Sequence, residues 1–133
     1  MLEFYISFAR ILLAICLGGI IGIERERNHK PAGMRTHMLV AMGSCLFTLS
    51  SISLGTDPAR IAASIVTGIG FIGAGTIIGE RSNKIVGITT AASLWTTAGI
   101  GMLAGIGEYP IAVAASFAVL FILLFDFVVK KLV

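Results

Sequence analysis

The chain contains few of the residues from which catalytic and metal sites are usually built. Of its 133 residues, 13% are charged, and only two are cysteine, two histidine and one tryptophan. Cys16 and Cys45 both fall in the middle of apolar stretches, where a disulfide framework is not expected. The seven Asp and Glu residues are scattered and form no recognisable magnesium cage. Because Mg²⁺ usually keeps several waters and needs only one or two carboxylates, it stays open as a ligand.

Patterns that indicate catalysis or nucleic-acid binding are also missing. No Ser-His-Asp arrangement is apparent, and neither His29 nor His37 has the second histidine four residues later that a helical zinc site uses. The net charge of +3 does not indicate nucleic-acid binding, because the basic residues are loop anchors. We therefore expect a protein that is not an enzyme, with no cofactor and no nucleic-acid partner.

Apolar residues, in contrast, are abundant. They make up 56% of the chain, and its mean hydropathy of +0.97 exceeds what a soluble domain of this size needs. Five apolar stretches, each close to the ~20 residues that a helix needs to cross a bilayer, cover residues 4–23, 38–54, 61–79, 85–106 and 111–129. The pattern predicts an all-α polytopic membrane protein with five transmembrane helices, forming a single domain over residues 1–133.

The basic residues predict the orientation of these helices. Eight of the ten Lys and Arg residues lie in the first loop, the third loop or the C-terminal tail, which fall on one side of the membrane: Arg25, Arg27, Lys30, Arg35, Arg81, Lys84, Lys130 and Lys131. The other side has only Arg60, and Arg10 lies within the first stretch. Because positive loops stay cytoplasmic, we expect the N-terminus outside and the C-terminus inside.

A segment at the end of the first stretch recurs at the end of the third. Residues 18–25 (GGIIGIER) and 75–81 (GTIIGER) differ by one deletion, and Gly33 with Thr36 is echoed by Gly87 with Thr90. This predicts two duplicated helical hairpins, formed by the first two and the next two spans, with the fifth helix added. Chance similarity between two helices rich in Gly and Ile is the alternative.

The glycines predict close helix packing. The string Gly68-x-Gly70-x-x-Gly73 matches a dinucleotide fingerprint, but it lies inside a transmembrane pattern and no βαβ unit surrounds it. Small residues let helix backbones approach closely in membranes. We expect packing roles, including the contacts of a homodimer, for Gly18, Gly22, Gly68, Gly70, Gly73 and Gly75. An irregular third span that lines a polar cavity is the alternative.

Charged residues near the ends of spans are the main candidates for function. Glu24, Arg25 and Glu26 directly follow the first stretch, and Arg35, Thr36 and His37 open the second. Glu24 with Arg35 is the expected pair, and Glu24 is the best candidate for a metal ligand; solvated loop charge is the alternative. Arg10 is expected to reach the outer surface or pair with Glu108. Asp126 and Lys130 have the spacing of an ordinary ion pair.

The fourth stretch carries a series of hydroxyl groups. Thr89, Ser93 and Thr96 follow a helical spacing, with Thr90 and Thr97 beside them. These groups either support packing or line a polar site, in which Thr89, Thr90 and Thr96 are candidates. Trp95 lies in the middle of the stretch, and its indole N–H needs an acceptor, so we expect it to face protein rather than lipid.

Four collinear motifs resemble the MgtC/SapB family of membrane proteins. They are residues 19–26 (GIIGIERE), 31–40 (PAGMRTHMLV), 68–75 (GIGFIGAG) and 87–95 (GITTAASLW), and the resemblance covers roughly residues 8–107. It implies a multi-pass protein of the bacterial inner membrane with about five helices. It also implies that the Glu-Arg-Glu and Arg-Thr-His motifs hold site residues. The virulence-type motif has Asn and Cys where this chain has Thr89 and Thr96.

The resemblance also implies a function. Family members are associated with magnesium limitation, survival inside host cells and control of membrane potential through the proton-translocating ATP synthase. Virulence-associated members carry a soluble domain after the last helix, whereas this sequence stops at Val133, as expected for a short SapB-type member or a trimmed chain.

Two classes of function remain open. One is a regulatory protein that binds a membrane partner such as the ATP synthase. The other is a homodimeric transporter or channel for Mg²⁺ or another small cation or solute. A continuous polar path between Thr96 and Arg10 would favour transport.

Overall fold

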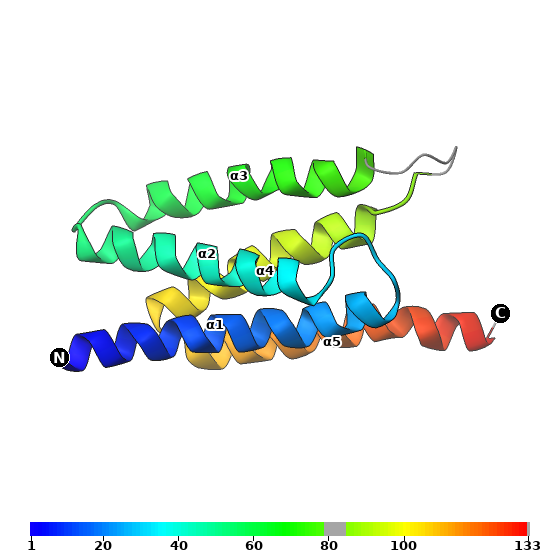
Figure 1. The fold of residues 1–133 in the computed structure, drawn as a ribbon, viewed down its shortest axis with the longest axis horizontal. Coiled ribbons are helices and arrows are strands. Elements are labelled where there is room, and N and C mark those ends of the chain that lie inside the picture. Colours follow the sequence, from blue (N-terminus) through cyan, green and yellow to red (C-terminus); the bar gives the residue numbers. More distant parts are fainter. Residues whose placement is uncertain (79–84, 133) are drawn as a thin grey trace.

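The structure is a computed structural model that describes residues 1–78 and 85–132; for residues 78 and 126–132 it describes the backbone. The described residues form five helices and no strand, which confirms the all-α prediction (Figure 1). These are α1 (Leu2–Arg27), α2 (Met34–Ser53), α3 (Pro58–Ile78), α4 (Ile88–Ile106) and α5 (Tyr109–Leu132).

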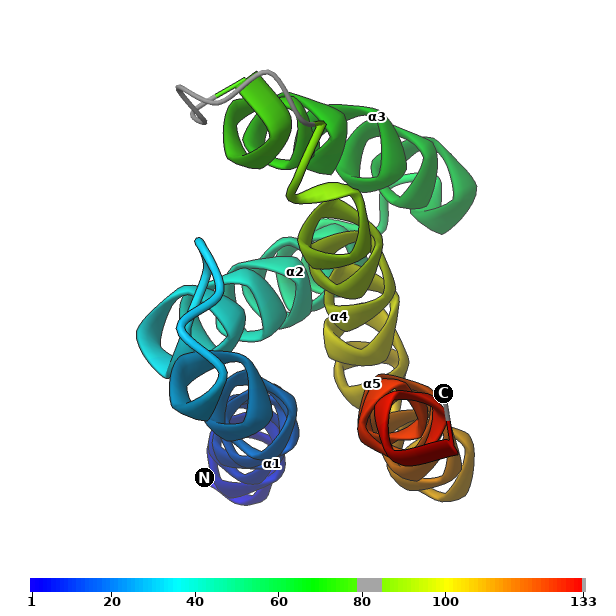
Figure 2. The ribbon, with the colours of Figure 1, turned by 90° about the vertical axis from the view of Figure 1, so that its right-hand side faces the viewer.

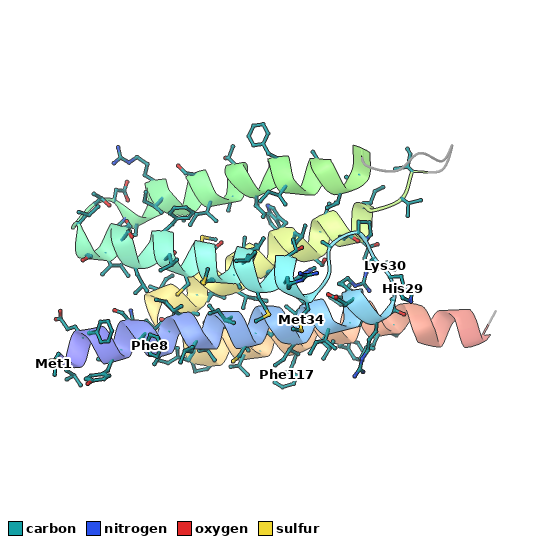
Figure 3. The ribbon with its side chains drawn as sticks, in the orientation of Figure 1. Met1, Phe8, His29, Lys30, Met34 and Phe117 are labelled. Atoms are coloured by element: carbon teal, nitrogen blue, oxygen red, sulfur yellow. The ribbon has the colours of Figure 1, made fainter. Side chains whose placement is uncertain are left out.

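Successive helices run in opposite directions along the bundle (Figure 1). The α1–α2 loop, the end of α3, the start of α4 and the C-terminus lie at one end, which we call the basic end. The N-terminus and the α2–α3 and α4–α5 turns lie at the other, the far end. His29 and Lys30 mark the basic end and Met1 the far end (Figure 3). This alternation is the arrangement that an N-outside, C-inside topology requires, and the orientation itself stays a prediction.

Helix length and apolar content single out several of these helices as membrane spans. Among the described residues, α1, α2 and Pro58–Ile77 of α3 are long and apolar enough to cross a membrane, and Tyr109–Phe125 of α5 is a shorter apolar helix. Expected span α4 is not in this group, because its first half carries five hydroxyl residues that lower its hydropathy. It lies instead among the other helices, where hydroxyl groups can find acceptors.

Helix α4 lies at the centre of the bundle and packs against all four other helices (Figure 2). Small residues allow this. A methyl group added at Gly105 would lie 2.9 Å from Cβ of Thr48, and one added at Gly101 would overlap the carbonyl group of Ala41. Neighbours α1 and α2, and α3 and α4, pack as antiparallel pairs, as duplicated hairpins would, although the duplication stays a prediction.

The predicted packing glycines behave in two ways. A methyl group at Gly18 would lie 2.6 Å from the carbonyl oxygen of His37, one at Gly22 2.5 Å from Cα of Met34, and one at Gly73 3.4 Å from Cβ of Ala91. These three glycines therefore lie at close contacts between helices of the chain. At Gly68, Gly70 and Gly75 an added methyl group would meet nothing within 4 Å, so they make no such contact within the chain, and their packing role in a homodimer stays a prediction. All three are exposed, and of the described α3 residues only Ile69 and Gly73 are buried.

Candidate functional site

The last turns of α1 hold a buried ion pair. Glu24 and Arg25 are 7% and 3% exposed, and Nε of Arg25 donates a hydrogen bond to Oε2 of Glu24. The side-chain amide of Asn28 donates to the other carboxylate oxygen at 2.6 Å and to the Glu24 carbonyl at 3.0 Å. Both carboxylate oxygens therefore have donors, which a metal ion at Glu24 would have to displace. In the described part of the chain, no group of three or more His, Cys, Asp or Glu side chains could hold a metal ion.

The predicted pair of Glu24 with Arg35 is wrong. Arg35 is exposed on the first turn of α2, and the partner of Glu24 is its own neighbour. Adjacent residues on a helix do not normally face each other, so helical spacing gives no hint of this pair. The long Arg25 side chain reaches Glu24 because both residues are enclosed at the end of α1, where burial makes a nearby counter-charge necessary.

His37 links the start of α2 to α4. It is fully buried, with Nδ1 2.9 Å from the Gly33 carbonyl oxygen and Nε2 3.0 Å from Oγ of Ser93. A carbonyl can only accept, so Nδ1 carries a proton and the neutral ring accepts from Ser93 through Nε2. The Ser93 hydroxyl also lies 2.8 Å from the Thr90 carbonyl oxygen, so it has a choice of two acceptors.

Glu26 holds the α1–α2 connection in a different way. Its Oε2 accepts a hydrogen bond of 2.6 Å from the backbone N–H of Met34, the first residue of α2. The carboxylate thus satisfies one of the unpaired N–H groups at a helix start and complements the positive end of the helix dipole. Gly33 permits this approach, because a side chain there would overlap the Glu26 carboxylate.

The buried hydroxyl face of α4 differs from the predicted one. Thr90, Ser93 and Thr97 are buried, whereas Thr89 is exposed and Thr96 bonds back to the Ala92 carbonyl at 2.7 Å. Of the expected helical series, Ser93 and also Ile100 at its far end are buried, whereas Thr89 and Thr96 are not. Thr89 and Thr90 are adjacent, as are Thr96 and Thr97. The sequence was therefore equally compatible with a buried face through Thr89 and Thr96 and with one through Thr90 and Thr97.

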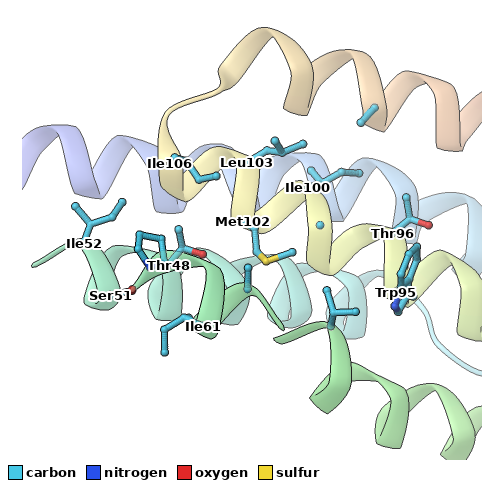
Figure 4. Close-up of a pocket in the computed structure, with 15 residues that line it drawn as sticks. Thr48, Ser51, Ile52, Ile61, Trp95, Thr96, Ile100, Met102, Leu103 and Ile106 are labelled. Carbon is cyan, nitrogen blue, oxygen red and sulfur yellow. The ribbon is translucent and has the colours of Figure 1, made fainter. Parts of the chain in front are cut away.

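Trp95 is also placed differently from the expectation. It is 56% exposed in the single chain, so the prediction that it faces protein is wrong there. With Thr96 it lines an apolar cavity of about 450 Å³ between α2, α3 and α4 (Figure 4).

The structure therefore brings part of the candidate set together. We define the polar cluster as Glu24, Arg25, Asn28, His37, Thr90 and Ser93. Hydrogen bonds link Glu24, Arg25 and Asn28 at the end of α1 and, separately, His37, Ser93 and Thr90 between α2 and α4. The close approach of Gly18 and Gly22 to the first turns of α2 brings the two sets to the same end of the bundle. Asn28 and Ser93 belong to the cluster but were not among the predicted site residues. Of the two, only Ser93 could have been found from sequence, through its place in the hydroxyl series. Thr36 is half-buried outside the cluster, Arg35 and Thr89 are exposed, and Trp95 lines the separate apolar cavity.

Arg10 links α1 to the end of α4 and the start of α5 at the far end. Its Nη1 donates to the Gly105 carbonyl oxygen at 2.8 Å, its Nε donates to the Tyr109 hydroxyl at 3.0 Å, and its guanidinium carbon lies 6.0 Å from the Tyr109 ring centre. The prediction of a Glu108 partner is wrong, because the last carbonyls of α4 lack helical partners and attract a cation. The expected pair of Asp126 and Lys130 lies outside the described side chains.

Apolar packing separates Arg10 from the polar cluster. One layer consists of Ala14, Ala41, Cys45 and Ala104, and a second contains Leu17, Ile21 and Ile100. Buried hydroxyls also occur in this part of the bundle, but Thr48 donates to the Ser44 carbonyl oxygen at 2.8 Å and Thr97 to the Ser93 carbonyl oxygen at 2.7 Å, so both are bonded within their own helices. Between Arg10 and Glu24, α1 contributes only apolar side chains, glycines and Cys16. A separate cavity of about 850 Å³ lies between α2 and α3.

Sequence comparison supplies the family. The MgtC family profile matches residues 11–132. The chain belongs to the MgtC family. Escherichia coli K12 has a relative named "Putative magnesium transporter YhiD", 48% identical over 124 residues, which are 86% of this chain and 57% of the relative. Protein MgtC of Salmonella typhimurium is 50% identical over 111 residues, 83% of this chain and 48% of the relative.

A third relative, from Haemophilus influenzae, is 41% identical over 129 residues, 89% of this chain and 54% of the relative. The chain therefore spans about half the length of these curated relatives. No solved structure matches it significantly. With the apolar helices, the family places the chain among multi-pass membrane proteins.

Proposed function

We propose that this MgtC-family chain is a regulatory domain of the bacterial inner membrane that acts in magnesium limitation and membrane energetics by binding a partner. The observation that carries the proposal is the apolar packing between the polar cluster and Arg10. An ion that moved through the helix bundle would have to pass Ala14, Cys45 and Ala104, where the nearby Thr48 hydroxyl is already bonded to the Ser44 carbonyl oxygen, so little would replace its hydration.

In this proposal the polar cluster holds α1, α2 and α4 in one fixed arrangement. Its residues come from α1, α2 and α4 at the basic end. Three of the four motifs that resemble the family also lie there, and the fourth occupies the half of α3 that is nearer to this end. A buried ion pair and a buried histidine fix one arrangement of these helices, so a partner at this end would meet a defined surface. The ATP synthase is the partner that the family resemblance suggests, and the surrounding bilayer and a second copy are the other expected contacts.

A homodimeric transporter for Mg²⁺ or another small cation is the second candidate. One observation favours it: the cavity between α2 and α3 extends from Thr36 near the basic end to Arg60 near the far end. A second copy could close such a cavity into a path. The name of the Escherichia coli relative also points to magnesium transport.

Magnesium flux distinguishes the two candidates. The purified protein would be placed in liposomes that contain a magnesium-sensitive dye, and a membrane potential would be imposed. The proposal predicts flux no greater than in empty liposomes, with circular dichroism showing that the reconstituted protein is folded. Flux above that background would overturn the regulatory proposal. If Glu24→Gln abolishes the flux while circular dichroism shows that this variant is also folded, the ion site lies at the polar cluster.

A further inference from the structure

The α2–α3 groove, as we name the larger cavity, lies along two helices that make the smallest contact of any packed pair in the bundle. On one side its lining extends from Thr36 of α2 to Leu54, directly after that helix, and on α3 from Arg60 to Ile72. These lengths of helix span about 27 Å and about 18 Å, so the groove is longer than half of the ~30 Å hydrocarbon core. Its volume of about 850 Å³ is within the ordinary range of ligand sites.

The walls of the groove suit hydrocarbon. Leu39, Phe47 and Ile72 line it and are largely exposed, and Val40, Ile65 and Ile69 add further apolar surface. Several hydroxyl groups in the wall are already bonded within the chain: Ser64 donates to the Arg60 carbonyl at 3.0 Å, and Thr56 donates to the Ser51 carbonyl at 3.2 Å. These groups therefore need no polar occupant.

The far end of the groove carries one positive charge. Arg60 lies in the first turn of α3, is exposed, and has no ion-pair partner among the described residues. Asp57 is three residues away and keeps its negative charge, but it does not line the groove; one of its carboxylate oxygens accepts from the backbone N–H of Ala59 at 3.0 Å. The other basic residue of this end, Arg10, is bound to Gly105 and Tyr109. A long apolar groove with a cation at one end matches an amphiphile with a negative head.

We propose that the α2–α3 groove binds one anionic phospholipid, with an acyl chain between the helices and the headgroup phosphate at Arg60. A second copy of the chain fits less well. A two-fold symmetric contact through this face would set the groove against itself and bring the two Arg60 side chains to the same depth. The proposal does not rest on the regulatory function, and a lipid in the groove would exclude its use as an ion path closed by a second copy.

Open glycines allow the groove to be filled without disturbing the fold. A methyl group added at Gly43 of α2 or Gly68 of α3 meets nothing within 4 Å, and both residues line the groove. Gly43→Leu/Gly68→Leu should therefore occupy the acyl-chain site. Gly70→Leu is the matched control, because Gly70 is equally open but does not line the groove. Arg60→Gln removes the charge alone.

Native mass spectrometry in detergent, with equal amounts of phosphatidylglycerol and phosphatidylethanolamine added, tests the proposal. We expect the unaltered chain to retain one lipid and to prefer phosphatidylglycerol about five-fold, as a single basic residue near the membrane surface should provide. Arg60→Gln should reduce the preference to near equality, the double leucine variant should lose the retained lipid, and Gly70→Leu should behave like the unaltered chain. Unchanged lipid retention in the double variant would overturn the proposal, as would loss of a dimer without loss of lipid, which would assign the groove to a second copy.

Discussion

The buried ion pair of the polar cluster makes the most quantitative prediction. Glu24→Gln keeps the size of the side chain and an acceptor for Asn28, but it leaves the Arg25 guanidinium, which is 3% exposed, without its counter-charge. Breaking a buried pair by removing one charge costs about 3–5 kcal/mol, because the remaining charge is desolvated and unpaired. We therefore expect Glu24→Gln to lower the free energy of unfolding by about this amount.

A second substitution separates the ion pair from other effects of the first. Arg25→Met removes the orphaned charge and keeps most of the apolar volume, so Glu24→Gln/Arg25→Met should recover most of the lost stability. The measurement is unfolding of the detergent-solubilised protein by increasing SDS, followed by circular dichroism. A cost below about 1 kcal/mol for Glu24→Gln, the range of exposed pairs, would refute the reasoning. A double variant less stable than Glu24→Gln would refute it equally.

Three further predictions concern other parts of the bundle. Arg10→Leu should destabilise the protein by about 1–3 kcal/mol, the cost of leaving a buried acceptor unpaired, whereas Arg10→Lys should lose less; SDS unfolding measures both, and equal losses would contradict the bonded role of the guanidinium. Gly18→Leu should prevent α1 from packing on α2 and abolish folded protein in membranes, whereas Gly70→Leu, in open space, should accumulate normally. In a low-magnesium growth assay Glu24→Gln should impair the activity of the chain far more than Glu108→Gln, since Glu108 is exposed and outside the cluster; equal effects would remove Glu24 from the site.

The main features of the fold could be predicted from sequence because they depend on hydropathy and length. Five apolar runs predicted five helices, and short connections between them required alternating directions. The ends were less accurate, since α1 continues to Arg27, four residues beyond its apolar run. Glu and Arg are good helix formers, so a helix continues through them although hydropathy falls.

The partners of the site residues were harder to predict. Arg10 binds the carbonyl oxygen of Gly105, and backbone acceptors leave no trace in the residue types. Glu24 pairs with its neighbour, against the usual helical spacing. Glycine content predicted close packing equally for α1 and α3, but only tertiary structure decides whether a glycine faces a helix, as Gly18 does, or open space, as Gly70 does.

The most direct test of the central claim uses the native cysteine in the apolar layer. Cys45 is fully buried between Ala14, Ala41 and Ala104. In a Cys16→Ala variant Cys45 is the only cysteine. Membrane vesicles that contain this variant would be treated with a charged methanethiosulfonate reagent, with and without Mg²⁺ and an imposed potential. Leu54→Cys in a chain without the native cysteines is the control, because Leu54 is 76% exposed at the far end. The account predicts that Cys45 stays unmodified while the control reacts completely; modification of Cys45 at a rate near that of the control would show a water-filled path through the bundle and contradict it.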